Sequence, residues 1–482
     1  MITKINDYST GPFKRLIGNE NDTPPNDVGN GSEFFDMTNK KTKLFDAESQ
    51  TWDEQPGAGP SVDVQALSVT ENGTYTAPEG TAYSPVTVYV PQGGGGVASN
   101  DVNFYDYDGT IVASYSAADF ASLTAMPANP DRTSEGLTAQ GWNWSLADAK
   151  AYVAAYGMLD IGQMYITTDG KTRVYVHLEE GRLSPRLGLG VNGSVDIDWG
   201  DGTAHDTLTG SNVGTLVDTT HTYAAAGDYV IALTVTGSAS IFGVAAGSYL
   251  FYASNNTKYA YLNSVTRVEI GANMKLGNYA FEVFYSLKSI TIPNGITQIP
   301  QYAFQNCKSL NGVVVPENTE SILKGAFMAC SSLKVAALPK ISFSMAEDVF
   351  KSCSALKRIT FYSSYAGLSL GNTVFMSCGA IFAATLGGKI ITILNEAFSY
   401  CGSIVRVNIP QTVTTINASV FNNCYSLASI KFEPTTPPSV LNSNAFTNVP
   451  TDCKIYVPSG SLNAYKTATN YPNPNTYTYV EY

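Results

Sequence analysis

The sequence contains few charged residues and very little histidine. Charged residues make up 14% of the 482 positions, and there are three histidines. No Cys-x-x-Cys pair is present either, which argues against a zinc site built from cysteine and histidine. The 42 glycines and 30 tyrosines are typical of a β-rich, turn-rich chain with uncharged polar surfaces, and the length predicts several domains.

Targeting and membrane signals are also missing. Residues 1–7 lack the charged and apolar segments of an export signal, and the C-terminus shows no anchor. The uncharged run Tyr229–Thr257 is broken by three glycines and is rich in Ser, Asn and Thr. We therefore expect no signal peptide and no membrane insertion. A protein that acts outside the cell would then be released by lysis of its host.

The charge is unevenly spread along the chain. Residues 262–482 hold 15 Lys and Arg against 10 Asp and Glu, a balance of +5. Since the whole chain carries −12, the first 261 residues carry −17. An acidic first half argues against nucleic acid as a partner, whereas an anionic glycan could bind the basic C-terminal part.

A phenylalanine recurs at nearly constant spacing over the C-terminal half. The intervals are 23 or 25 residues, and the eight positions are Phe281, Phe304, Phe327, Phe350, Phe375, Phe398, Phe421 and Phe446. A period of this size predicts a solenoid, in which each repeat buries its apolar face by stacking on its neighbours.

Other positions keep the phase of this repeat. Three residues after six of the phenylalanines stand Cys307, Cys330, Cys353, Cys378, Cys401 and Cys424. A leucine or isoleucine follows three residues later, and then an alternating apolar pair such as Ile290 and Ile292. The i, i+3 spacing predicts a helical or 3₁₀ turn, and the alternation predicts a short strand. Stacking such units gives a parallel β-sheet along one side of the solenoid.

These residues resemble the BspA-type leucine-rich repeat with its Ala-Phe-x-x-Cys-x-x-Leu core. Ala303–Leu310 and Ala397–Cys401 are close matches, and the resemblance covers residues 262–458. It implies a surface protein that binds large partners. Val349 and Val374 replace the core alanine in the fourth and fifth copies, where two spacings lengthen to 25, so we expect these turns to bulge.

The six in-phase cysteines should stack about 5 Å apart, roughly the spacing of neighbouring strands. We interpret them as small buried apolar side chains that pack inside the solenoid, with disulfides between adjacent turns as the alternative. Cys453 lies outside this row.

The outward face of the repeat sheet is the predicted ligand-binding surface. Strand side chains alternate, so the residues between the buried ones must point away from the core. The outward residues predicted to bind a ligand are Arg358, Thr360, Thr385, Arg406, Asn408 and Lys431. The basic ones could hold carboxylate or phosphate groups of a glycan or teichoic acid. A solvated sheet without a ligand is the alternative.

Two linkers rich in proline and glycine divide the N-terminal half, at residues 56–60 and 91–96. Residues 1–55, with short strand patterns such as Gly31–Met37, resemble N-terminal modules of phage structural proteins of Gram-positive gut bacteria. This resemblance implies a virion-attachment module. Residues 61–91, with Thr70–Pro78, resemble a further small β module of such proteins.

Residues 98–172 predict an α+β domain with a helix that begins after Ser145 and ends at Gly157. Trp142 and Trp144 could stack on a sugar, although a buried aromatic core is the favoured interpretation.

One motif in this segment could carry chemistry. Phe104–Val112 resembles the first motif of haloacid-dehalogenase (HAD-like) phosphatases, which would make Asp106 a nucleophile and Asp108 a general acid. Asp201 and Asp206 could imitate the acidic pair that holds Mg²⁺ in that family. Too few helix–strand alternations separate the motifs for such a fold, so we favour a β-turn and predict no catalytic residues.

Residues 173–238 resemble a polycystic-kidney-disease (PKD) domain, on the motifs Val195–Thr203 and His221–Tyr223. The resemblance implies an immunoglobulin-like β-sandwich that acts as a spacer or interaction module. Calcium binding and a structural role in turns are both open for three acids, Asp196, Asp198 and Asp201, and the turn role is favoured.

The sequence thus predicts a multi-domain, mainly β protein that ends in a solenoid over residues 239–482. We expect a non-enzymatic phage fibre or adhesion protein on the virion surface, without cofactors. Its predicted partners are other virion proteins, bound through residues 1–55, and a host-surface glycan or protein, bound through the repeats. The alternatives are a bacterial cell-surface adhesin and a HAD-like phosphatase. Tail or capsid location, and a homo-oligomeric state, stay open.

Overall fold

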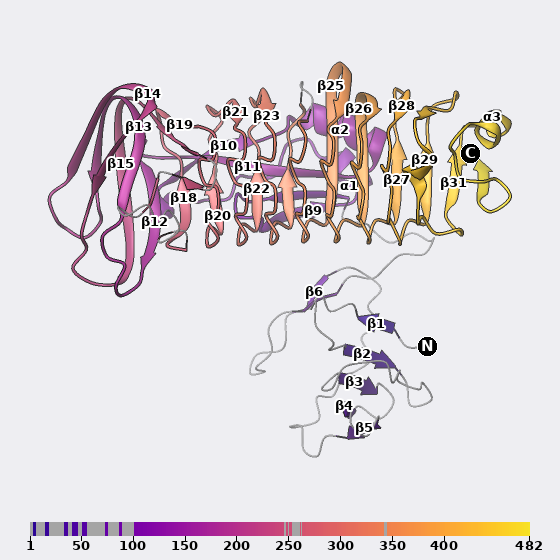
Figure 1. Cartoon of the computed structure of the whole chain (residues 1–482), viewed down its shortest axis with the longest axis horizontal. Helices are drawn as coiled ribbons and strands as arrows, with labels where there is room; N and C mark the ends of the chain where they lie inside the picture. Colours follow the sequence, from indigo (N-terminus) through magenta and orange to yellow (C-terminus); the bar gives the residue numbers. More distant parts are fainter. Residues whose placement is uncertain are drawn as a thin grey trace. The chain divides into compact units, whose positions relative to one another are not determined.

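The computed structural model describes residues 101–244, 247–248, 250–252, 261, 263–341 and 345–482, and seven backbone strands in the first 100 residues. It is 39% strand and 8% helix, which confirms the mainly β fold class. The chain forms two compact units, Met1–Gly94 and Gly95–Tyr482, and each is described by itself (Figure 1). Among the described residues, no helix is long and apolar enough to cross a membrane.

The first unit contains a five-stranded sheet and a separate hairpin. The sheet has the order β1-β2-β3-β4-β5, in which β2 and β3 are parallel and the other pairs antiparallel. Its strands are Thr3–Ile5, Arg15–Gly18, Glu33–Asp36, Lys41–Asp46 and Thr51–Glu54, and the hairpin joins β6 (Gly73–Tyr75) to β7 (Val86–Val88). The short strands predicted here are therefore present. The linkers at 56–60 and 91–96 and the side chains of both modules lie outside the described residues.

The second unit begins with a four-stranded sheet and two helices, which we call the covering segment (residues 101–167). The sheet order is β10-β11-β8-β9, with β8 and β11 parallel. Its elements are β8 (Val102–Tyr105), β9 (Ile111–Tyr115), α1 (Ala117–Ser122), a 3₁₀ turn (Thr133–Glu135), β10 (Leu137–Trp142), α2 (Leu146–Tyr156) and β11 (Leu159–Thr167).

The predicted helix ends in the covering segment are confirmed. The Ser145 hydroxyl accepts a hydrogen bond from the Asp148 N–H at 3.1 Å, which caps α2, and Gly157 ends it in the left-handed conformation. Trp142 and Trp144 are buried in the domain core, as the favoured interpretation predicted.

Four long strands follow and form one antiparallel sheet in the order β14-β13-β15-β12. They are β12 (Thr172–Leu178), β13 (Arg186–Asp198), β14 (Asp206–Thr220) and β15 (Gly227–Ile241). Through β18 (Val265–Glu269) this sheet continues into β20 (Ser289–Thr291), the first strand of the repeats, while β19 (Met274–Leu276) pairs with β15. The expected two-sheet sandwich is therefore wrong for these strands, because all four are hydrogen-bonded into a sheet that runs on into the solenoid. The small hairpin β16 (Gly243–Val244) and β17 (Gly247–Ser248) lies beside them in sequence.

The C-terminal part is a parallel β-solenoid of about nine turns, as the repeat predicted (Figure 1). Its main strands are β20, β22 (Gly312–Val314), β24 (Val335–Ala337), β25 (Arg358–Leu370), β26 (Ala383–Ile393), β27 (Arg406–Ile409), β29 (Ser429–Phe432), β31 (Lys454–Val457) and β32 (Thr478–Glu481). A second row of short strands holds β21 (Gln298–Ile299), β23 (Ser321–Ile322), β28 (Thr415–Ile416) and β30 (Ser439–Val440). A 3₁₀ turn (Ser443–Phe446) and α3 (Leu462–Thr467) lie near the C-terminal end.

The eight phenylalanines form one continuous stack inside this solenoid. Successive ring centroids lie 5.1 to 5.8 Å apart and neighbouring rings are nearly parallel. The predicted bulge is also confirmed, because the β25–β26 register shifts between Ser363 and Leu368.

Seven of the eight turns that carry a phenylalanine are not helical. Hydrogen bonds from residue i+3 to residue i are present, for example from the Cys307 N–H to the Phe304 carbonyl at 3.1 Å. However, the residues two before and two after the first seven phenylalanines adopt positive φ, such as Tyr302 at 54° and Asn306 at 61°. The predicted helical or 3₁₀ turn is therefore confirmed at Phe446, in the 3₁₀ turn Ser443–Phe446, and is wrong at the other seven, where left-handed residues turn the chain at both sides of the phenylalanine.

Candidate ligand-binding groove

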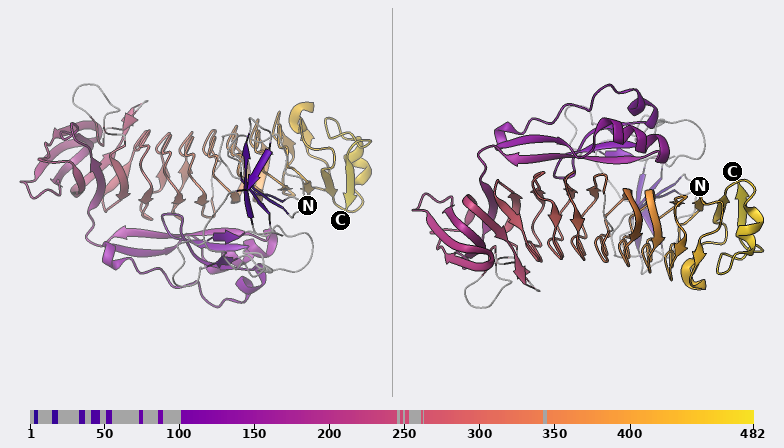
Figure 2. Two further views of the ribbon diagram at one scale, coloured as in Figure 1. Left: turned by 90° about the horizontal axis from the view of Figure 1, so that it is seen from below. Right: turned by 90° about the horizontal axis from the view of Figure 1, so that it is seen from above.

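The covering segment lies against the outward face of the repeat sheet, as Figure 2 shows in two views. Asn143 donates from its side-chain amide to the carbonyls of Val315 and Ala337, at 3.0 and 2.9 Å. The Trp144 indole donates to the Leu338 carbonyl at 2.8 Å. These buried bonds, which use repeat carbonyls as acceptors, fix the segment on the middle of the sheet.

Close packing accompanies these bonds. A Cβ atom on Gly162 would lie 2.5 Å from the side chain of Val314, so only glycine allows β11 to approach so closely. Met164 packs against Val314 and Ala337 in a small buried cluster. The middle of the outward face is therefore inside the protein.

Three of the six predicted ligand residues lie under this cover. Arg358 binds the Asp160 carboxylate through its Nε, at 2.9 Å from each oxygen, and donates to the Leu159 carbonyl at 3.1 Å. Thr360 and Thr385 point outward as predicted, but both are buried. The expectation that these three residues face solvent is wrong, because Leu159 and Asp160, about 200 residues earlier in the chain, cover Arg358 and Thr360. Thr385 is buried at the edge of the cover.

The other three predicted residues, Arg406, Asn408 and Lys431, lie together beyond the edge of the cover. They line a groove of about 620 Å³ that also includes the buried Thr385. One wall comes from β26, β27, β29 and β31, and the other from the end of α2 at Tyr156, Gly157 and Met158. We call this site the open groove.

The cations of the open groove are available to a ligand. Arg406 and Lys431 are exposed, and within the described part of the chain neither has a carboxylate partner. The Lys431 ammonium lies 4.2 Å from the centroid of the Tyr482 ring. Asn408 donates to Glu433 at 2.7 Å, while its own carbonyl oxygen is buried without a hydrogen-bond partner. The groove therefore offers two cations without an ion-pair partner and an aromatic ring, beside the carboxylates of Asp101 and Glu433.

Two neighbouring residues were missed from the sequence. Lys454 and Tyr456 lie on β31, and the strand register places them beside Ser429 and Lys431 on the outward face. The alternation Lys454–Val457, with Ile455 and Val457 buried, carries the signal. The repeat alone did not predict this strand, because no further phenylalanine follows Val457 to show which of its residues point inward.

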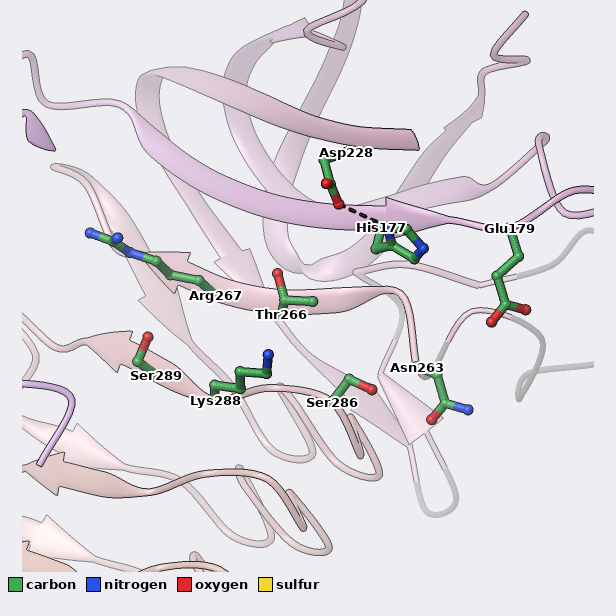
Figure 3. Close-up of a pocket in the computed structure, with 9 residues that line it drawn as sticks. All are labelled: His177, Glu179, Asp228, Asn263, Thr266, Arg267, Ser286, Lys288 and Ser289. Carbon is green, nitrogen blue, oxygen red and sulfur yellow. Dashed lines mark hydrogen bonds and ion pairs between the residues drawn. The ribbon is translucent and has the colours of Figure 1, made fainter. Parts of the chain in front are cut away.

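A second pocket of about 820 Å³ lies at the other end of the repeats. Figure 3 shows it between the His177–Asp228 pair and Lys288, with several hydroxyl groups on its wall. His177 and Asp228 are 2.8 Å apart and both are exposed. Arg267, on its wall, is held by Glu135 at 2.7 Å and also contacts Glu269. None of the predicted ligand residues lies here.

The phosphatase motif forms an ion pair in place of a reactive site. Both oxygens of Asp106 are engaged, one with the Tyr107 N–H at 2.8 Å and the other with the Arg132 guanidinium at 2.7 Å. The Asp106 carbonyl accepts from the Gly109 N–H at 3.0 Å, which closes the predicted β-turn. A carboxylate held by an arginine in this way is a poor nucleophile.

The three acids considered as calcium ligands contact two different histidines. His205 lies 2.9 Å from Asp196 and 3.7 Å from Asp198, whereas Asp201 contacts His221 at 2.8 Å. Within the residues that the structure describes, no group of three acidic, cysteine or histidine side chains is arranged to hold a metal ion.

Comparison with known proteins supports the repeat class. The family model "BspA type Leucine rich repeat region" matches residues 274–381 and 368–468, in six copies. Residues 274–468 thus form a BspA-type leucine-rich repeat region. No curated protein matches the chain in sequence.

Solved structures of leucine-rich repeat proteins are similar to parts of the chain. One from Bacteroides ovatus is 19% identical with a TM-score of 0.27; the match covers 45% of this chain and 66% of that one, just under two thirds of its length. A leucine-rich cell surface protein from Faecalibacterium prausnitzii is 16% identical with a TM-score of 0.27, over 50% of this chain and 94% of that one. A leucine-rich repeat protein from T. pallidum is 20% identical with a TM-score of 0.24, over 35% and 79%.

Proposed function

We propose that this chain is a non-enzymatic fibre or adhesion protein on the surface of a phage virion. The N-terminal residues 1–55 attach it to other virion proteins, and the repeats are displayed to a glycan or protein on the host surface. The protein acts at the virion surface without membrane insertion or nucleic acid, and it can assemble as a homo-oligomer. The observation that carries the proposal is the open groove, with its unpaired cations on an exposed part of the repeat sheet.

The division of the chain into units supports this arrangement. The attachment module falls in the separate compact unit Met1–Gly94, away from the repeats in sequence. The four-stranded sheet of residues 172–241, which carries the PKD-like motifs, serves as a rigid spacer because it is continuous with the solenoid.

Binding to intact cells tests the groove. A labelled full-length chain is added to a panel of Gram-positive gut bacteria, and the bound amount is compared between three proteins. These are the original chain, the variant Arg406→Ala/Lys431→Ala/Lys454→Ala, and a matched variant that removes three exposed lysines elsewhere, Lys334→Ala/Lys357→Ala/Lys466→Ala. We expect at least a tenfold loss for the groove variant and little change for the matched one. Equal binding by all three would refute a role for the groove.

The location of the protein in phage and in bacteria tests the proposal that it belongs to the virion. Gold-labelled antibodies against the chain should decorate purified phage particles. A bacterial cell-surface adhesin is the second candidate, because BspA-type repeats resemble those of surface proteins. That candidate predicts label on the envelope of uninfected bacteria and none on particles.

A further inference from the structure

We propose that the open groove binds an anionic glycan that carries acid groups along its length. Carboxylate or phosphate groups bind the cations, and sugar rings lie against tyrosines. This inference rests on the proposed role of the groove as the ligand site and names the class of ligand.

The strand register sets the spacing of the cations. Arg406 pairs with Ser429, and Ser429 pairs with Lys454, so the two basic residues stand two strands apart, about 10 Å. Lys431 lies on the strand between them, two residues further along. Cations spread in this way fit successive acid groups of an extended polymer better than a single small anion.

The carboxylates of the groove are hydrogen-bonded to uncharged donors. Glu433 accepts from the Asn408 amide at 2.7 Å and from the Gln411 N–H at 3.1 Å. Asp101 accepts from the Ala117 N–H at 3.0 Å. In the described part of the chain, Arg406, Lys431 and Lys454 form no ion pair with either acid, so a ligand can bind them without breaking one.

The aromatic side chains of the groove favour sugars as ligands. Tyr156, Tyr456 and Tyr482 border the groove, and aromatic faces pack well on the apolar faces of sugar rings.

Titration of the full-length chain with defined polymers tests the proposal. The probes are polygalacturonate for carboxylates, poly(glycerol phosphate) for phosphates, and neutral dextran. Each is measured by calorimetry at low and high salt, with the original chain, the groove variant and the matched lysine variant described above. Two further variants test the aromatic contact: Tyr456→Ala, and Tyr456→Phe as its conservative control.

We expect one or both anionic polymers to bind and dextran not to bind. The groove variant should bind about ten- to a hundredfold more weakly, the matched variant should keep its affinity, and salt should weaken binding. Tyr456→Ala should lose affinity that Tyr456→Phe retains. The polymer that binds identifies the source of the anion.

Two results would overturn the proposal in different ways. If the groove variant fails to bind cells but no anionic polymer binds the original chain, the groove is a ligand site and the glycan class is wrong. A protease-sensitive cell ligand in that experiment would identify a protein partner. If the groove variant binds both cells and polymers like the original chain, the proposed role of the groove fails together with its ligand.

Discussion

At the residue scale, the cysteines of the repeat both pack in the core and donate hydrogen bonds. Each of the six is fully buried, and its thiol donates to the carbonyl of the phenylalanine one turn earlier, as from Cys353 to Phe327 at 3.1 Å. The six distances lie between 3.0 and 3.2 Å. Their spacing in the sequence predicted the buried row, but not these bonds, because a spacing says nothing about which carbonyl a thiol can reach.

Burial should make all seven thiols unreactive in the folded protein. It raises the pKa of Cys424 and of Cys453 to about 12, so little thiolate exists at pH 8. We expect no reaction with a thiol reagent at pH 8 in the native protein, and seven thiols per chain after unfolding. Fewer than seven after unfolding without reductant would indicate the disulfides that the alternative interpretation allowed.

Removing one of these thiols should destabilise the solenoid. Cys353→Ala leaves a small cavity and an unpaired carbonyl, which costs about 1–2 kcal/mol of unfolding free energy. The exposed Ser331→Ala is the matched control and should change stability little. Denaturant unfolding measures both. Equal stability of the two variants would show that the thiol contributes nothing.

Asp201 should make the stability of the four-stranded sheet of residues 172–241 depend on pH. Burial alone would raise its pKa, but hydrogen bonds from Thr203 and His221 outweigh burial and lower the pKa to about 2. A lowered pKa in the folded state stabilises the protein above the unfolded pKa near 4, and this stability is lost as the pH falls toward 2. Asp201→Asn should therefore cost about 1–2 kcal/mol at pH 6 and progressively less between pH 4 and pH 2.

The control for this pH dependence is Asp228→Asn. Asp228 pairs with His177 on an exposed surface, so its loss should cost little at any pH. If Asp201→Asn and the original chain differ by the same free energy at pH 6 and pH 3, the acid dependence assigned to Asp201 is wrong.

At the scale of elements, the sequence predicted the repeats far better than their surroundings. The phenylalanine period, the strand phase and the bulge after Phe350 follow from local spacing, because each turn contacts its neighbours in the same way. The cover could not be predicted, since the contact between Asp160 and Arg358 joins residues almost 200 positions apart without any local signature. Three groove residues, Arg406, Asn408 and Lys431, were predicted from the alternation of side chains along the strands. That alternation shows which residues point outward, but it does not show which of them another segment of the chain covers.

The buried Arg358–Asp160 pair should be the strongest single link between the cover and the repeats. Burial alone would lower the pKa of Arg358, but the Asp160 carboxylate outweighs it and keeps that pKa above its ordinary value. Arg358→Ala leaves Asp160 buried without its partner and should cost about 3–5 kcal/mol of unfolding free energy. The double variant Arg358→Met/Asp160→Leu should recover much of this loss, because no buried charge remains.

Lys340→Ala is the control for this ion pair. Lys340 contacts Asp148 at 2.8 Å across the same interface, but both side chains are more than a third exposed. Its loss should cost less than about 1 kcal/mol. Similar costs for Lys340→Ala and Arg358→Ala in denaturant unfolding would contradict the structural role of the buried pair.

At the scale of the whole molecule, the repeat face is divided between two tasks. The turns that carry β22, β24 and β25 bind the chain's own covering segment, and those that carry β27, β29 and β31 border the open groove. The basic balance of residues 262–482 is consistent with this division, since three of its cations lie at the open end: Arg406, Lys431 and Lys454. Under the proposed function, one solenoid provides both a rigid connection and a binding surface.

Binding through the open groove is tested most directly by attaching a bulky group inside it. Ser429→Cys lies on the groove wall, whereas Ser331→Cys is an exposed control on another turn, and the native thiols are buried. Both variants are labelled with a large maleimide reagent, and binding of each to host cells is measured with and without the label. We expect the label to abolish binding at position 429 and to leave it unchanged at position 331. Undiminished binding by the protein labelled at position 429 would contradict binding through the open groove.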